Sequence, residues 1–358
     1  MTPGPPYLRL KTPKFAHNNL SFSPYFDRRF ALASGSNFGL VGNGRLHIID
    51  LDPSIPGGLR CVKYFETRDV VFDVAWNESH ENQIVAACGD GSIKMFDITL
   101  EGLPIRSWHE HSSEIMSIDW NNLQKDTFVT ASWDSTIKVW TSSRQTSLLT
   151  IHSPSSTHSP NDNNKTQIYN ASFSPHSPWL LASCGSDGYI NLCDLRQQQN
   201  QQQQQRSGNS NTIKPILSIP AGVPPLSNAN VNSNPDPKQV IDILHCDWNK
   251  YEQTLLATAN KDGTVRTYDI RRGQNERGQI VGKHELACRK VQWNPHKRDQ
   301  VASVGYDMAC RVWNTNPPSP AYIHQDHTEF AMGLGWSLFD PGLLASAAWD
   351  EEVHLYRV

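Results

Sequence analysis

The feature of this sequence that most constrains its fold is a short hairpin pattern that recurs along the whole chain. Its clearest copy is Thr130-Ala-Ser-Trp-Asp-Ser-Thr-Ile-Lys-Val-Trp140, in which apolar residues alternate on both sides of a turn at Asp134. Such alternation predicts two β-strands joined by a tight turn. Because two strands alone cannot bury a face, the pattern predicts a fold that is built by repeating this unit.

The pattern occurs seven times when the turn residue is aligned. Each copy has an apolar or small residue three positions after the turn residue, and most have a bulky one six positions after it. The turn residues are Asn43, Asp90, Asp134, Asp187, Asp262, Asp307 and Asp350. Their separations are 47, 44, 53, 75, 45 and 43 residues. Apart from two long intervals, this period of roughly 40 to 45 residues is typical of the blades of a β-propeller.

A second marker precedes each hairpin, namely an apolar alternation that ends in an aromatic residue. The seven aromatic residues are Phe22, Trp76, Trp120, Phe173, Trp248, Trp293 and Trp336. Since both markers agree in order and number, we predict an all-β fold, a seven-bladed β-propeller in which these segments are the inner strands. We expect residues 1–358 to form a single domain, because radial repetition lets one closed domain reach this size.

The two ends of the chain are complementary. The last repeat ends at Val358, directly after a third strand expected over His354 to Arg357, so its blade lacks one strand. Tyr7 to Lys11 alternates like a strand and precedes the first inner strand. We predict that this N-terminal strand completes the last blade and closes the ring, because an unpaired strand edge is otherwise exposed.

Two inserts account for the long intervals. Residues 153–166 are polar and rich in turn residues, and residues 197–238 contain a Gln/Asn tract followed by a Pro- and Ser-rich stretch. Neither insert has enough apolar residues to offset the entropy of ordering it. We expect both to be mobile loops between blades.

Composition excludes several classes of function. The net charge of −3 argues against a general affinity for nucleic acid or anionic membranes. Seven cysteines, an odd number with no Cys-x-x-Cys pair, indicate free thiols in a reducing compartment. No apolar run approaches the ~18 residues of a membrane span, and the first residues lack the apolar core of a secretory signal. We therefore expect a soluble protein of the cytosol, without insertion into a membrane.

Histidines ahead of the inner strands can pair with the turn aspartates. The expected sets are His111, Thr130 or Ser132, Asp134 and Trp140 in the third blade, His284 and Asp307 in the sixth, and His327 and Asp350 in the seventh. Because these sets recur at equivalent positions, they predict buried structural networks rather than a catalytic triad. The other histidines lack the spacing of metal ligands. We expect no enzymatic activity, no metal and no cofactor.

The repeat spacing, the Ser-Trp-Asp elements and the His–Asp pairs resemble the WD-repeat family over residues 7–358. A narrower resemblance is carried by two long stretches, Gly35-Ser-Asn-Phe-Gly-Leu-Val-Gly-Asn-Gly44 and Phe72-Asp-Val-Ala-Trp-Asn-Glu-Ser-His-Glu-Asn82. Together with Ser-Trp-Asp in the third blade and Trp349-Asp350 in the seventh, they are similar to the peroxin-7 family, the import receptors for the type 2 peroxisomal targeting signal.

That resemblance implies a non-enzymatic receptor that works in the cytoplasm and cycles to the peroxisome. It implies binding of an N-terminal cargo signal of the form Arg/Lys, Leu/Val/Ile, five residues, His/Gln, Leu/Ala. It also implies a co-receptor peroxin and delivery to the peroxisomal docking complex. The Gln-rich insert departs from the family pattern. An alternative is a substrate adaptor or scaffold of a ubiquitin ligase, since Cys193-Asp-Leu-Arg196 and Tyr268-Asp-Ile-Arg271 approximate a Trp-Asp-x-Arg signature.

Such a signal forms an amphipathic helix whose recognition requires apolar pockets and a few carboxylates. On a propeller, the mouth of the central channel is lined by the starts of the inner strands and by the residues before the turns. Our candidates there are Asp69, Phe72, Glu114, Met116, Trp133, Tyr169, Asp242, Tyr306, Phe330, Met332 and Trp349. The same positions include Lys261 and Arg289, and also Val70, Leu244 and Ala287, for which filling the channel is an equally good interpretation.

Overall fold

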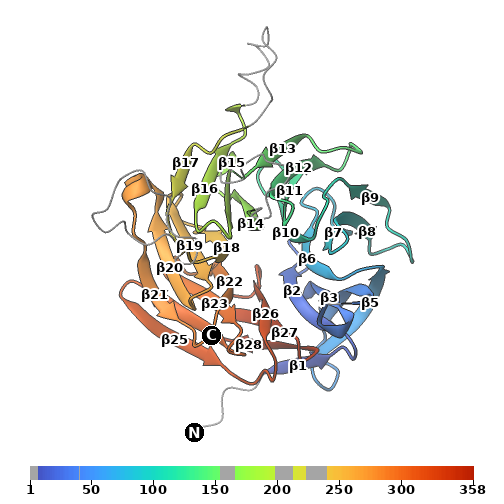
Figure 1. The fold of residues 1–358 in the computed structure, drawn as a ribbon. Coiled ribbons are helices and arrows are strands. Elements are labelled where there is room, and N and C mark those ends of the chain that lie inside the picture. The colour runs from blue at the N-terminus through green and yellow to red at the C-terminus, as the bar shows by residue number, and fades with distance from the viewer. Residues whose placement is uncertain (1–6, 40, 154–165, 198–212, 223–239) are drawn as a thin grey trace.

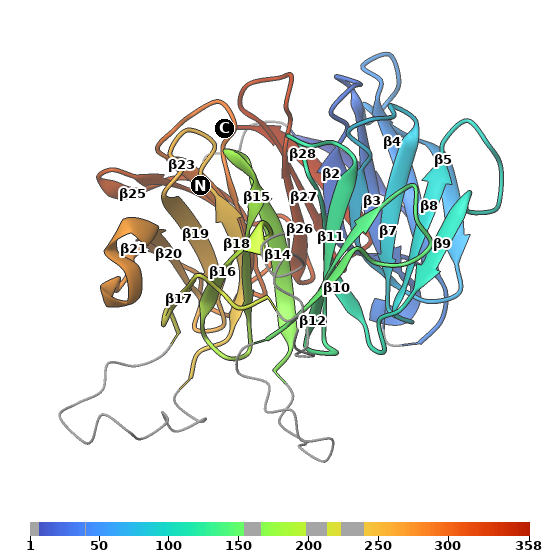
Figure 2. The ribbon, with the colours of Figure 1, turned by 90° about the horizontal axis from the view of Figure 1, so that it is seen from above.

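The strands in the described part of this protein form seven four-stranded antiparallel sheets arranged around a central axis (Figure 1). The structure is a computed structural model and describes residues 7–39, 41–153, 166–197, 213–222 and 240–358. Each inner strand contacts the inner strands of the two neighbouring sheets, so the sheets close into a ring. The view from the side in Figure 2 shows strands of successive blades running alongside one another. The predicted seven-bladed β-propeller is confirmed.

Blades are numbered in chain order, and their strands run from the axis outward. Blade 1 contains β2 (Ala16–Phe22), β3 (Arg29–Gly35), β4 (Gly44–Leu51) and β5 (Leu59–Thr67). Blade 2 contains β6 (Val71–Trp76), β7 (Gln83–Cys88), β8 (Ser92–Asp97) and β9 (Arg106–His109). Blade 3 contains β10 (Ile115–Trp120), β11 (Thr127–Ser132), β12 (Thr136–Thr141) and β13 (Leu149–His152). Blade 4 contains β14 (Ile168–Ser174), β15 (Ser177–Gly185), β16 (Ile190–Asp194) and β17 (Leu217–Ile219).

The remaining blades follow the same order. Blade 5 contains β18 (Ile243–Trp248), β19 (Leu255–Asn260), β20 (Thr264–Asp269) and β21 (Gln279–Lys283). Blade 6 contains β22 (Cys288–Trp293), β23 (Gln300–Gly305), β24 (Cys310–Thr315) and β25 (Pro318–His324). Blade 7 contains β26 (Ala331–Trp336), β27 (Leu343–Ala348), β28 (Glu352–Arg357) and the N-terminal β1 (Leu8–Lys11). In the described residues, two short 3₁₀ helices, η1 (Ser36–Gly39) and η3 (Ile270–Asn275), follow β3 and β20. No helix among these described segments is long and apolar enough to cross a membrane.

The N-terminal strand closes the ring as predicted. β1 pairs antiparallel with β28, from Leu8 opposite Leu355 to Lys11 opposite Glu352. The sequence placed the start of β28 two residues late, at His354, because Glu352 interrupts the apolar pattern. Tyr7 lies just outside β1 and packs its ring on His354, with the ring centroids 4.7 Å apart. The pairing supplies the fourth strand of blade 7 and covers the edge of β28, which would otherwise be unpaired.

The second insert is shorter than the sequence predicted. Residues 213–222 were expected in the mobile loop over 197–238, but they carry β17, the outer strand of blade 4, which pairs with β16. Ile213 and Ile219 are fully buried, and their burial stabilises the structure of this stretch. The surrounding residues are so polar that the composition does not indicate a strand here. The mobility that we expected for 154–165, 198–212 and 223–239 concerns residues outside those that the structure describes.

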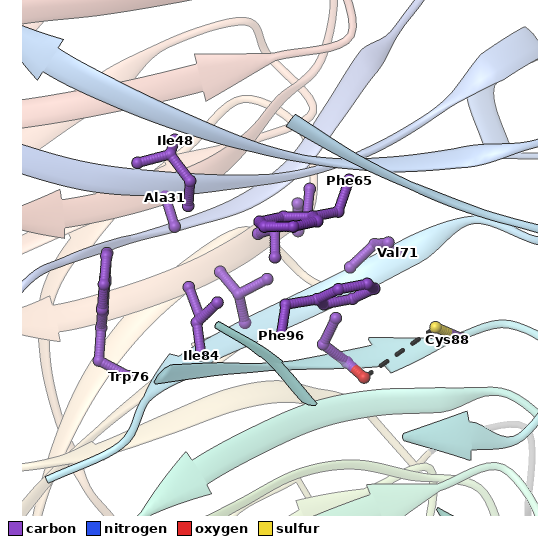
Figure 3. Close-up of a cluster of buried hydrophobic side chains, with 12 residues drawn as sticks. Ala31, Ile48, Phe65, Val71, Trp76, Ile84, Cys88 and Phe96 are labelled. Carbon is purple, nitrogen blue, oxygen red and sulfur yellow. Dashed lines mark hydrogen bonds between the residues drawn. The ribbon is translucent and has the colours of Figure 1, made fainter. Parts of the chain in front are cut away.

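Apolar side chains from neighbouring blades fill the space between the sheets. Figure 3 shows the cluster between blades 1 and 2, where the rings of Phe65 and Phe96 stack with their centroids 4.6 Å apart. Trp76 belongs to the same cluster and donates its indole N–H to the carbonyl of Ser21 in blade 1 at 3.0 Å. Aromatic pairs of this kind stabilise beyond the area that they bury. The seven cysteines are free thiols, and all except the half-buried Cys61 are buried.

The predicted His–Asp networks are present in blades 3, 6 and 7. In blade 3, His111 contacts Asp134 at 2.8 Å and Thr130 at 2.7 Å, and Trp140 donates to Thr130 at 2.8 Å. Burial alone raises the pKa of Asp134, but the contacts with His111, Thr136 and Ser112 lower it to about 2. His284–Asp307–Ser303 and His327–Asp350–Ser346 repeat this arrangement. Both nitrogens of each histidine are engaged within the blade, which is what a structural role requires.

Candidate binding site at the channel mouth

Every inner strand begins with the same irregularity. The register of each inner strand against its neighbour shifts by one residue near its start, in all seven blades. A β-bulge of this kind leaves one residue unpaired and redirects its side chain. The unpaired residues are Asn18, Phe72, Met116, Tyr169, Leu244, Arg289 and Met332. They form one ring of side chains around one end of the channel, which we call the mouth.

A second set of side chains is held beside this ring by a repeated backbone hydrogen bond. The residue before the turn aspartate donates its N–H to the carbonyl of the residue that leads into the inner strand. The bonds are Trp133 to Glu114, Lys261 to Asp242, Tyr306 to Ala287 and Trp349 to Phe330, at 3.0 to 3.1 Å, with equivalents from Gly89 to Val70 and from Ser186 to Gln167 at 2.9 Å. The β-turns and the bulges therefore converge on the mouth.

Five of the predicted residues line one pocket in the mouth. The pocket has a volume of about 420 Å³ and extends from blade 3 to blade 6. Its lining is Met116, Trp133, Tyr169, Asp242, Leu244, Lys261, Ala287, Arg289 and Tyr306. Leu244 and Ala287, left open by the sequence, contribute to its wall. A pocket of this size with mostly apolar walls and a few polar groups is typical of ligand sites.

The charge of Asp242 is partly balanced inside the pocket. Its carboxylate accepts a hydrogen bond from the hydroxyl of Tyr169 at 3.2 Å and pairs with Lys261 at 3.1 Å. Burial and the adjacent carboxylate of Asp242 raise the pKa of Tyr169, so its hydroxyl stays protonated and serves as a donor. The side chain of Lys261 is exposed to solvent and does not fully cover Asp242. The carboxylate of Asp242 can therefore accept another hydrogen bond from a ligand in the pocket.

Two further predicted carboxylates lie just before the inner strands of blades 2 and 3. Glu114 is half-buried and accepts a hydrogen bond from the hydroxyl of Ser113. Asp69 accepts the backbone N–H of Val70 at 2.7 Å. Neither carboxylate forms an ion pair with any residue in the described part of the chain. This side of the mouth therefore carries two carboxylates without a basic partner in the segments that the structure describes.

Aromatic rings continue the mouth beyond the pocket. Tyr306 contacts Phe330 with ring centroids 4.9 Å apart, and Phe330 contacts Trp349 at 5.5 Å. Trp349 in turn contacts Phe38 at 5.7 Å and donates its indole N–H to Asn18 at 3.1 Å. The structure thus places Phe330 and Trp349 on the rim between blades 6 and 1, outside the pocket itself.

Phe38 is the mouth residue that the sequence analysis missed. It lies in η1, within the glycine-rich stretch Gly35–Gly44, and is 48% exposed. Asn37 and Phe38 both have left-handed backbones, with φ of 48° and 59°, which is unusual for residues other than glycine. The glycine-rich stretch carries the family resemblance, but its spacing alone does not indicate that an aromatic ring reaches the mouth.

Two further predicted residues, Met332 and Phe72, also lie outside the pocket. Met332 is only 6% exposed and lines a small cavity inside the channel with Asn18 and Arg289, so it forms part of the floor of the mouth. Phe72 is the half-buried bulge residue of blade 2 and does not line the pocket. Their part in binding is therefore indirect in this arrangement.

Ionisable side chains fill the channel below the mouth. Lys290 donates to Asn19 at 2.6 Å, and Asn19 donates to Asp73 at 2.5 Å. Burial lowers the pKa of Lys290 to about 8, against the opposing effect of Asp73. Burial also raises the pKa of Asp119, on β10, to about 7, although it accepts the N–H of Phe173. Through these hydrogen bonds the channel groups join blade 6 to blade 1, blade 1 to blade 2, and blade 3 to blade 4.

Three histidines at the ring closure are close enough together to be considered as metal ligands. His324, His327 and His354 have ring nitrogens within 4.8 Å of one another. Both nitrogens of His327 contact Asp350 and Ser346, while His354 contacts His324 at 2.8 Å and Glu352 at 2.9 Å. These hydrogen bonds already use the nitrogens that a metal requires, so the geometry favours a structural cluster.

Comparison with known proteins adds two findings. The family model described as WD domain, G-beta repeat, matches residues 59–97, 102–141 and 154–194. The peroxisomal targeting signal 2 receptor of Saccharomyces cerevisiae is 33% identical over 98% of this chain and 99% of its own length. The receptor of the same name from Schizosaccharomyces pombe is 30% identical over 98% and 99%, and that from Mus musculus is 31% identical over 94% and 92%.

Proposed function

This chain belongs to the family of peroxisomal targeting signal 2 receptors, and on that premise we propose that it binds the type 2 signal of cargo proteins at the channel mouth for import into the peroxisome. The three relatives compared above are named for this receptor role, and the near full-length match covers all seven blades. We further propose that the chain acts as one domain, has no enzymatic activity of its own, and binds its cargo in the cytoplasm before cycling to the peroxisome.

The observation that supports this function best is the combination of one apolar pocket with free carboxylates at one side of it. A helical signal of nine residues has its first and last residues about 12 Å apart along the helix axis. Its basic residue and its aliphatic residues lie on one face, and the lining of the mouth offers a counterpart for each. An amphipathic helix in an apolar groove is a common mode of peptide recognition.

We assign the individual contacts from charge and shape. Glu114 and Asp69 receive the basic residue at the start of the signal, because they lack basic partners in the described chain. Met116, Trp133 and Leu244 contact the aliphatic residues. Asp242 receives the His or Gln near the end of the signal, since its carboxylate can accept one more hydrogen bond beside Tyr169 and Lys261.

A co-receptor peroxin and the peroxisomal docking complex complete the proposal. The pocket is open on one side, and the aromatic rim from Tyr306 to Phe38 remains exposed next to it. A second protein that covers a helix in this groove is consistent with both features. Nucleic acid and direct insertion into a membrane have no place in this proposal.

The alternative of a ubiquitin-ligase adaptor is not favoured. The arginines of both Asp-x-Arg sequences bind the aspartate of the same sequence, Arg196 to Asp194 at 2.9 Å and Arg271 to Asp269 at 2.9 Å. In each case the aspartate also accepts the backbone N–H of the arginine, and this contact stabilises the turn that follows the strand. These residues therefore have a local structural role.

Calorimetric titration of the full chain with a synthetic type 2 signal peptide tests the proposed function. We expect saturable binding that is lost when the Arg and His of the peptide are replaced by Ala. The titration is repeated with the co-receptor present, in case the two proteins share the site. An absence of sequence-dependent binding under both conditions would exclude the proposed function.

A further inference from the structure

The pocket contains one positive charge that no carboxylate among the described residues balances. Of its three charged residues, Asp242 and Lys261 pair with each other at 3.1 Å. The third, Arg289, is the bulge residue of blade 6 and is half-buried. It forms no ion pair with any carboxylate among the residues that the structure describes. A guanidinium against mostly apolar walls favours an incoming anion or carbonyl group.

Arg289 lies at the end of the pocket opposite to Glu114. The pocket begins at Met116 and Trp133 in blade 3, and Trp133 is hydrogen-bonded to Glu114. It ends at Arg289 and Tyr306 in blade 6. In a closed ring of seven blades, three blades is the largest possible separation, so blades 3 and 6 face each other across the mouth. The mouth is therefore negative at one end and positive at the other.

We propose that Arg289 receives the C-terminal end of the bound signal helix and thereby sets the direction in which the helix lies. This inference rests on the proposed function and adds the orientation of the ligand and a residue that determines specificity. The last turn of a helix has free carbonyl oxygens and a partial negative charge, whereas the first turn is positive. The basic residue of the signal adds to the positive end, which then lies beside Glu114 and Asp69.

The reverse orientation places like charges together at both ends. The basic residue of the signal would then lie against Arg289, and the carbonyl end of the helix would lie against Glu114. The intermediate position of Asp242 in blade 5 agrees with the first orientation, because the His or Gln of the signal lies near the end of the helix. Arg289 then contacts the residues that directly follow the signal, and it favours carboxylates there over ammonium groups.

Charge variants of the ligand and the receptor test this inference. Three peptides carry the same signal and differ only in the second residue after it, which is Asp, Asn or Lys. We expect the full chain to bind the Asp peptide at least tenfold more tightly than the Lys peptide. Arg289→Glu should reverse this order, and Arg289→Lys should keep it in weaker form. Lys297→Glu makes the same change of charge at the opposite end of blade 6, where Lys297 is exposed, and should leave the order unchanged.

Photo-crosslinking gives the direction of the helix independently of affinity. A benzophenone before the first residue of the signal should label blades 2 and 3, and one after the ninth residue should label blade 6. The exchanged pattern overturns the inference, as does an equal affinity of the wild-type chain for the Asp and Lys peptides. If no signal peptide binds at all, the proposed function itself fails, which is a distinct result. Thermal unfolding of each variant confirms that it is folded.

Discussion

The backbone N–H of Trp133 donates to the carbonyl oxygen of Glu114 at 3.1 Å, so that a turn between two strands fixes an aromatic wall beside a carboxylate. Trp133 lines the pocket from blade 3, and Glu114 directly precedes the inner strand of the same blade. The same bond recurs from Tyr306 to Ala287 and from Trp349 to Phe330. Recognition at the mouth therefore depends on a backbone geometry that the propeller repeats, with different side chains in each blade.

Glu114→Lys should weaken binding of the signal peptide by at least tenfold, about 1.4 kcal/mol. The substitution replaces a carboxylate that has no basic partner in the described structure by a cation that repels the basic residue of the signal. Titration calorimetry measures the change. Glu81→Lys is the matched control and should bind normally. Glu81 is exposed in the loop between β6 and β7, at the end of blade 2 that lies away from the mouth. Unchanged binding by the Glu114 variant would remove this residue from the site.

Trp133→Ala should weaken binding by roughly tenfold to a hundredfold, because buried tryptophans at the centre of an interface contribute more than their neighbours. Trp133→Phe is the informative companion. It keeps a smaller aromatic ring on the wall and removes an indole N–H that has no hydrogen-bond partner among the described residues. We expect near-normal affinity for the Phe variant, measured by fluorescence anisotropy with a labelled peptide. Equal losses for both variants contradict the role of Trp133 as an apolar wall.

Deletion of residues 1–12 should open the ring and lower the free energy of unfolding by several kcal/mol. The deletion removes β1, leaves β28 with an unpaired edge, and uncovers the apolar cluster that contains Leu343, Val353 and Leu355. Chemical denaturation and light scattering measure the loss of stability and the expected association. Deletion of residues 1–6 leaves every strand in place and serves as the control. A stable monomer after the longer deletion contradicts closure by β1.

Asp119→Asn should stabilise the protein above about pH 4, with the largest gain near and above pH 7. Burial raises the pKa of Asp119 to about 7, so the stability that its protonated form provides is present below about pH 4 and is lost as the pH rises through 7. Asn can still accept the N–H of Phe173 without carrying a charge. Asp119 faces the channel cavity, where solvent reduces the cost of its charge. We therefore expect a gain of only about 1 to 3 kcal/mol in the free energy of unfolding, measured with urea.

The pH dependence of the stability of Asp119→Asn distinguishes the loss of the Asp119 charge from a change in side-chain packing. The difference between wild type and Asp119→Asn should be small at pH 4 and grow up to pH 7. A difference that is constant across this range indicates that the ionisation of Asp119 does not limit stability.

Much of the fold could be predicted because its determinants are local. Alternation with a period of two residues identifies strands, and a turn aspartate with a histidine some 23 residues earlier identifies the buried networks, as His111 and Asp134 show. Repetition then assigned equivalent positions in all blades, which located Met116, Trp133, Tyr169, Asp242 and Tyr306 at one pocket. β17 was not predicted, because its three residues lie within a long polar segment. Their strand conformation depends on pairing with β16.

The parts of the site that could not be predicted depend on contacts between distant residues. Asp242 precedes an inner strand, and Lys261 lies in a turn 19 residues later, yet the two side chains form an ion pair. Because of this pair, Arg289 is the pocket cation that lacks a carboxylate partner among the described residues. Phe38 reaches Trp349 only because two residues other than glycine adopt left-handed backbones. Met332 was predicted at the mouth, but the packing of blade 7 buries it in the floor.

A charge exchange between Glu114 and the first residue of the signal tests the central claim most directly. Wild type and Glu114→Arg are each titrated with a signal peptide that begins with Arg and with one in which this residue is Glu. The account predicts that Glu114→Arg loses affinity for the Arg peptide and binds the Glu peptide more tightly than wild type does. Loss of binding to both peptides in a folded Glu114→Arg protein, without this rescue, would contradict the direct contact on which the account depends.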